Sequence, residues 1–221
     1  MKKLFFIISI VFLAFVVNAQ NAVTSSSSSD SDDSRNKLQI GIKAGANYSG
    51  IYDSKGEQFK AEGKFGFVGG GFLSIPIGEF LGFQPEVLFS QRGFKASGVL
   101  LGNNYSVATT NSYIDIPLQL QLKPSDVVTF LVGVQYSYLV SQKNTFTFGK
   151  NSVDQEKEFK NDNIRKNLFG LVGGIDFNIQ KYLVLSGRVG ADMLYNRGDG
   201  TSTTPRYKNI WGQITLGFKF Y

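Results

Sequence analysis

The chain has 221 residues, a formal net charge of +6 at pH 7, and charged residues at 18% of its positions. It contains no Cys and no His, which excludes disulfide bonds, thiolate metal sites and histidine-based acid–base catalysis. The positive charges are dispersed along the chain, so they predict no nucleic-acid partner. The 25 Gly and 20 Phe favour β-structure, and the low charge content suits a surface that faces lipid.

The first segment, residues 1–19, has the three parts of a secretory signal peptide. Two lysines precede an apolar run over 4–17, and Ala19 ends a small-residue cleavage site. The apolar run is shorter than the about 20 residues that a membrane-spanning helix needs. Residues 20–37, which include five consecutive serines, are predicted to be a flexible leader because they cannot bury apolar surface. We therefore expect an exported protein without a helical anchor.

From residue 38 to residue 221 the sequence alternates between apolar and polar residues, a pattern typical of β-strands with one apolar face. Eight strands are predicted, at about 38–49, 64–75, 81–95, 107–123, 127–140, 167–180, 182–195 and 208–221. They are longer than the usual strand of about 5–6 residues. They are also long enough to cross a membrane, which takes about 9–11 residues.

The predicted connections alternate between short and long. Tight turns are expected at 76–80, 124–126 and 180–181, and long polar loops at 51–63, 96–106, 141–166 and 196–207. Short turns at one end and long loops at the other are typical of outer-membrane barrels. The sequence therefore predicts an all-β fold over 38–221, an eight-stranded antiparallel up-and-down transmembrane β-barrel. Both chain ends are expected on the periplasmic side of the outer membrane.

Tyrosine and tryptophan gather near the strand ends that carry the long loops. These side chains favour a membrane–water interface, because one edge of the ring is apolar and the other is hydrated. The predicted aromatic girdle consists of Tyr48, Tyr113, Tyr136, Tyr138, Tyr195 and Trp211. Ordinary strand propensity is the alternative explanation, and it would scatter these residues along the strands.

The polar faces of the predicted strands carry four acids and four bases. They are Lys43, Glu86, Arg92, Asp115, Asp176, Arg188, Asp192 and Lys219. In a narrow barrel they should point into the lumen and pair, because an unpaired buried charge costs several kcal/mol. A proton or ion path, or hydrolysis by Glu86 and Asp115, is the alternative. Because nothing is placed to orient a nucleophile, we expect no catalytic residue, no metal, no cofactor and no enzymatic activity.

Several segments resemble the PorT-like outer-membrane β-barrel family of gram-negative bacteria. The resemblance rests mainly on GIKAGANYS, QPEVLFSQRG, YIDIPLQLQ, NLFGLVGGIDF and ITLGFKFY, which follow one another across nearly all of 38–221. It implies an eight-stranded barrel, and one branch of the family takes part in protein secretion across the outer membrane. Most members have no assigned task, so the resemblance implies fold and location more than activity.

The expected function is that of a non-enzymatic outer-membrane barrel acting as an envelope scaffold, a surface-interaction protein or a component of a secretion system. Its expected partners are membrane lipid and other envelope or secretion proteins, which the loops at 141–166 and 196–207 would contact. The main alternative is a soluble exported barrel of lipocalin type, with apolar faces inward around a hydrophobic ligand. A lipid-modifying enzyme and a narrow ion pore are weaker alternatives.

Overall fold

The chain divides into two compact units, residues 1–32 and 33–221. The computed structural model describes residues 34–55, 61–100, 103–148, 151–157, 165–196 and 206–220. The predicted signal peptide and most of the predicted leader lie outside the described residues. A short 3₁₀ turn, Ser34–Asn36, precedes the first strand. Among the residues that the structure describes, no helix is long and apolar enough to span a membrane.

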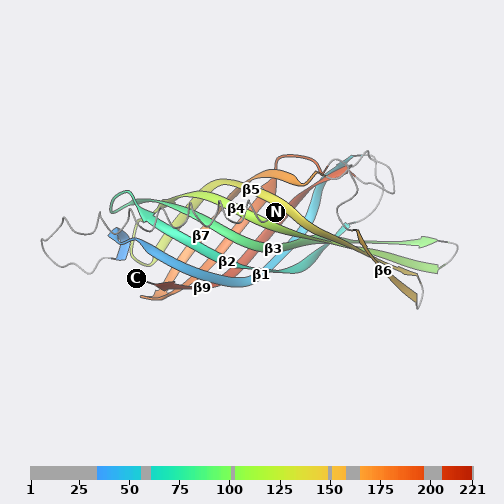
Figure 1. Ribbon diagram of the computed structural model, residues 1–221, viewed down its shortest axis with the longest axis horizontal. Coiled ribbons are helices and arrows are strands. Elements are labelled where there is room, and N and C mark those ends of the chain that lie inside the picture. Colours follow the sequence, from blue (N-terminus) through green and yellow to red (C-terminus); the bar gives the residue numbers. More distant parts are fainter. Residues whose placement is uncertain are drawn as a thin grey trace, which may run out of the picture. The chain divides into compact units, whose positions relative to one another are not determined.

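Nine strands follow the 3₁₀ turn in the described part of the chain. They are β1 (Gln39–Lys55), β2 (Ala61–Pro76), β3 (Leu81–Leu100), β4 (Asn103–Leu122), β5 (Val128–Phe148), β6 (Asn151–Lys157), β7 (Asn167–Gln180), β8 (Leu183–Asp192) and β9 (Arg206–Phe220). All except β6 form the wall of one antiparallel barrel (Figure 1). Pairing of β1 with β9 and of β4 with β5 closes the wall. The predicted eight-stranded antiparallel barrel is confirmed.

The two faces of each wall strand differ in the way the alternation predicts. On β9, the outward Ile210, Ile214 and Leu216 are 49%, 68% and 52% exposed, whereas Gln213 and Thr215 between them are buried. Large exposed hydrophobic residues continue around the barrel on the neighbouring strands. Apolar side chains thus face outward and polar side chains face inward, which is the reverse of the packing in a lipocalin-type barrel. An apolar outer band of this kind is suited to lipid.

All four of the predicted long loops are partly strand. In the loop predicted at 51–63, residues 51–55 and 61–63 belong to β1 and β2, and in the loop predicted at 196–207, residues 206–207 belong to β9. The loop predicted at 96–106 is wrong for most of its length, since β3 and β4 stay paired up to Leu100 and Asn103. The loop predicted at 141–166 is wrong for 141–148 and 151–157, where β5 and β6 form an antiparallel hairpin. These segments are polar, but a hairpin satisfies their backbone groups without an apolar face. Residues 149–150, 158–164 and 197–205 lie outside the described part.

The added strand length carries these hairpins beyond the barrel. Strands β3, β4 and β5 contain 20, 20 and 21 residues, about twice the number needed to cross the hydrocarbon layer. Figure 1 shows β3, β4, β5 and β6 continuing past the wall at one end. The opposite end carries the tight connections, such as the turn in which Ile77 N donates to Leu81 O at 3.0 Å. We call these the hairpin end and the short-turn end.

We expect the substitution Ile214→Lys to lower the free energy of unfolding by about 2–3 kcal/mol, because Ile214 lies near the middle of the outward apolar stripe of β9. Denaturant titration of the barrel refolded in lipid vesicles measures this change. The matched control is Ile40→Lys at the short-turn end of β1, where a charge reaches water and should cost about 0–1 kcal/mol. Equal costs at both positions would contradict a lipid-facing outer band.

Candidate functional site

The eight charged residues predicted to face the lumen are all buried inside the wall, with exposed fractions of 6% or less. They come from six strands: β1 (Lys43), β3 (Glu86, Arg92), β4 (Asp115), β7 (Asp176), β8 (Arg188, Asp192) and β9 (Lys219). Charges buried to this degree need partners of opposite sign or hydrogen bonds. Seven of the eight lie in two ion clusters.

The Glu86 cluster joins four strands across the lumen. The Lys43 ammonium lies 2.5 Å from Glu86 Oε2, and Arg188 Nη2 lies 3.7 Å from Glu86 Oε1. Arg188 Nη1 also donates to Asp176 Oδ1 at 2.7 Å. The amide of Gln119 lies between the charges, since its Nε2 donates to Glu86 and its Oε1 accepts from Arg188 Nε, both at 3.0 Å. Two acids and two bases therefore neutralise one another in place.

The Arg92 cluster lies nearer to the hairpin end. Arg92 Nη2 donates to Asp115 Oδ2 at 2.5 Å, and Nη1 lies 3.4 Å from Asp192 Oδ1. Ser90 also donates to Asp115, and Asn209 Nδ2 donates to Asp192 Oδ2 at 2.6 Å. One guanidinium is thus shared by two carboxylates, which have no more than a few per cent of their surface exposed.

Two residues of the predicted girdle point inward. Tyr113 and Trp211 are only 3% and 5% exposed, and the Arg92 Cζ atom lies 4.7 Å and 5.1 Å from their ring centroids. Their assignment to the girdle is wrong, because both share a strand face with polar lumen residues. The aromatic faces cover the buried guanidinium, which stabilises its charge. The strand alternation contained this signal, since Tyr113 has the same parity as Asp115.

The other four predicted girdle residues, Tyr48, Tyr136, Tyr138 and Tyr195, are at least partly exposed. Tyr48 is 52% exposed, and its ring centroid lies 4.9 Å from that of Phe65 on β2. The Tyr136 hydroxyl donates to Asn167 Oδ1 at 2.6 Å. These residues lie near the hairpin end, where the apolar band gives way to polar residues, so their positions fit an interfacial role.

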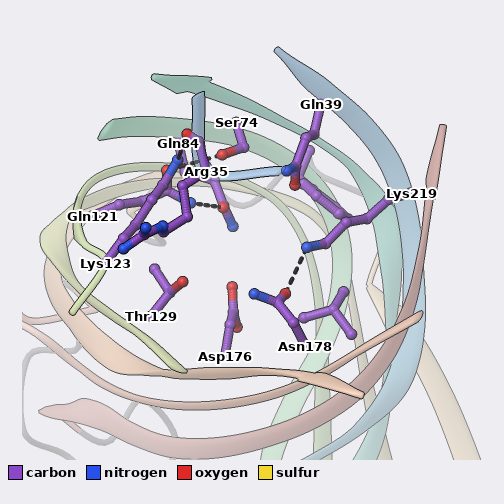
Figure 2. Close-up of a pocket in the computed structure, with 12 residues that line it drawn as sticks. Arg35, Gln39, Ser74, Gln84, Gln121, Lys123, Thr129, Asp176, Asn178 and Lys219 are labelled. Carbon is purple, nitrogen blue, oxygen red and sulfur yellow. Dashed lines mark hydrogen bonds between the residues drawn. The ribbon is translucent and has the colours of Figure 1, made fainter. Parts of the chain in front are cut away.

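Lys219 is separate from both clusters and lies at the short-turn end. Its ammonium reaches across to Asn178 Oδ1 at 2.5 Å, as Figure 2 shows. The two residues help to line a small polar cavity of ≈ 20 Å³, which has room for about one water molecule. The turn before β1 lies at this cavity, since Lys123 Nζ donates to Arg35 O at 3.1 Å. Arg35 in turn forms a 2.7 Å ion pair with Asp126.

Each lumen carboxylate has an arginine or lysine partner, so its negative charge is balanced by a cation held in a fixed position. Within the described part of the chain, no three metal-ligating side chains are grouped so as to hold a metal ion. Sequence reasoning identified the charges but missed two amides that bind them: Gln119 bridges Glu86 and Arg188, and Asn209 donates to Asp192. Both alternate with outward residues on their strands, so the same polar pattern could have identified them.

A closed antiparallel barrel with an apolar outer band and a charged, filled interior is a membrane-spanning β-barrel. The chain belongs to the family described as outer membrane protein beta-barrel domain, whose sequence profile matches residues 18–190. The match ends before β9. The family places the protein in the outer membrane.

Several solved outer-membrane proteins have a similar chain path. The attachment invasion locus protein Ail of Yersinia pestis is 12% identical, with a TM-score of 0.45 over 83% of this chain and 99% of its own. Neisserial surface protein A is 13% identical, with a TM-score of 0.46 over 82% of this chain and 97% of its own. A major outer membrane protein of Thermus thermophilus is 11% identical, with a TM-score of 0.46 over 83% of this chain and 100% of its own. No curated protein sequence matches the chain.

Proposed function

We propose that this protein is a non-enzymatic surface-interaction barrel, which anchors a protruding β-sheet in the outer membrane for contact with another envelope or surface protein. The observation that carries the proposal is the length of β3, β4 and β5, which exceeds what a membrane crossing needs. The excess residues keep their strand pairing up to Leu100 and Phe148. A paired sheet presents backbone and side chains in fixed positions, which suits recognition better than a loop does.

The proposed orientation places the hairpin end outside the cell and the short-turn end in the periplasm. Outer-membrane barrels generally have short periplasmic turns and longer external connections. Strand β1 begins beside the end of β9, with Ile40 paired to Phe220. Both lie at the short-turn end, so this orientation puts both ends of the barrel segment on the periplasmic side.

The ion clusters in the lumen support the proposal that the barrel is closed and non-catalytic. The Glu86 and Arg92 clusters each join several strands across the interior, and the carboxylates in them are neutralised by fixed partners. The Ser90 hydroxyl donates to Asp115 Oδ2, but Arg92 holds the same oxygen in an ion pair, and a carboxylate held in this way is a poor general base. We therefore propose that the polar interior stabilises the barrel and neither conducts solute nor catalyses a reaction.

Within the outer-membrane barrel family, we assign the chain to the PorT-like type on the strength of its motifs. These motifs contribute lumen charges: Lys43 lies in GIKAGANYS, Glu86 and Arg92 in QPEVLFSQRG, and Asp115 in YIDIPLQLQ. The resemblance therefore concerns the interior of the barrel, and it does not select between a secretion component and a scaffold. Detergent pull-down of partners distinguishes them, because only a secretion component should co-purify with other parts of an export apparatus.

Cysteine labelling tests the proposed function, because the natural chain has no Cys. We expect Thr147→Cys, near the outer end of β5, to react with a membrane-impermeant maleimide on intact cells. Ser125→Cys, in a short turn, should react only after lysis. A thiol-directed cross-linker on Thr147→Cys should then capture a discrete protein. Loss of that product after deletion of 97–106 supports the sheet as the contact surface, and capture of no protein contradicts the proposal.

A further inference from the structure

The outward face of β9 changes from apolar to basic at one point along the strand. From Phe220 to Ile210 its outward side chains are apolar or Gly, and the next two outward residues are Lys208 and Arg206. At about 3.4 Å per residue and a tilt of about 45°, the apolar part spans about 24 Å across the membrane. That height is close to the about 25 Å of a typical outer-membrane apolar band. The two bases therefore lie just outside the band, on the hairpin side.

Two tyrosines hold the bases in place. The Arg206 Cζ atom and the Lys208 ammonium lie 4.4 Å and 4.5 Å from the centroid of the same ring, that of Tyr195. The Lys208 ammonium is also 5.8 Å from the ring centroid of Tyr52, whose hydroxyl donates to Asp192 O at 2.6 Å. The two cationic groups thus lie within about 9 Å of each other. Like charges at this separation repel, and an anion bound between them lowers the energy.

We propose that Arg206 and Lys208, flanked by Tyr52 and Tyr195, bind a phosphate group of an outer-leaflet glycolipid. The guanidinium fork of arginine suits phosphate oxygens, and the ammonium adds a second charge-assisted contact. The site is continuous with lipid-facing side chains such as Ile210, which is 49% exposed. Acyl chains can therefore lie on the wall while the phosphate meets the bases, which favours a lipid over a free anion. The choice of the outer leaflet rests on the orientation proposed above.

Native mass spectrometry of the full-length folded barrel in a neutral detergent tests the site, with bisphosphorylated lipid A as the probe and its dephosphorylated form as the reference. We expect the phosphorylated form to bind more tightly. The double substitution Arg206→Gln/Lys208→Gln should reduce this affinity roughly 25-fold, because two bases at an anionic lipid surface are removed. The charge-matched control is Lys37→Gln/Lys181→Gln at the short-turn end, which should leave the affinity unchanged.

Heat-modifiable gel migration confirms that each variant is folded, so a loss of binding is separate from a loss of structure. Equal binding of the two lipid forms, or equal losses in both double variants, would overturn the site. Displacement of the lipid by millimolar inorganic phosphate alone would overturn its assignment to a lipid. Binding in detergent does not depend on orientation, whereas the cysteine labelling does, so failure of this site and failure of the proposed function give different results.

Discussion

Replacing Arg92 with Leu is expected to lower the free energy of unfolding by about 3–5 kcal/mol, the range for breaking a buried ion pair by removing one partner. The guanidinium serves both Asp115 and Asp192, at 2.5 Å and 3.4 Å. Without it, two carboxylates remain in the lumen with hydrogen bonds but no base. The rings of Tyr113 and Trp211 lose the cation that they cover.

Urea titration of the refolded protein in vesicles, followed by gel mobility without boiling, measures the loss. The first control is Lys95→Leu on the same strand, an exposed position where we expect a change within about 0.5 kcal/mol. The second control removes the whole cluster through Arg92→Met, Asp115→Leu and Asp192→Leu. It should recover most of the stability, because apolar residues often replace a buried ion cluster without net cost. Equal effects of Arg92→Leu and Lys95→Leu would contradict the cluster's role.

The strand alternation predicted which residues face the lumen, because side chains in a strand change face at every residue. It could not predict which acid pairs with which base. Arg92 meets Asp192, 100 positions later in the chain, only because closing the wall brings β3 opposite β8. Such pairings depend on the tilt and stagger of the closed barrel, and one strand's sequence does not encode them.

The misplaced girdle residues and hairpins have related causes. The positions of Tyr113 and Trp211 along their strands suggested that both lie at the membrane–water interface. Both side chains nevertheless lie on the lumen face of their strands, where their rings cover the Arg92 guanidinium. Polar composition suggested loops at 141–148, but strand propensity depends on context, and pairing with β4 and β6 satisfies this segment's backbone. Both errors come from interactions with other strands, which the composition of a single segment does not show.

Gly45→Ala is expected to destabilise the barrel by about 3 kcal/mol or more, at the upper end of the usual cost of overpacking. A Cβ atom on Gly45 would lie 2.0 Å from Ile214 O and 2.7 Å from Thr215 Cα, both backbone atoms of β9. Backbone in a paired strand cannot rotate away as a flexible side chain can. Because β1 and β9 close the wall, the added methyl group should separate the two strands at the seam.

The matched control is Gly187→Ala on β8, which is paired in register with Ile214 from the other side of β9. A Cβ atom there has nothing within 4 Å, so we expect an unchanged or slightly more stable barrel, since alanine restricts the unfolded chain more than glycine does. The folded fraction on unboiled gels after refolding should fall for Gly45→Ala alone. Equal folded fractions would mean that β1 and β9 can separate without cost, and closure at this seam would then not depend on glycine.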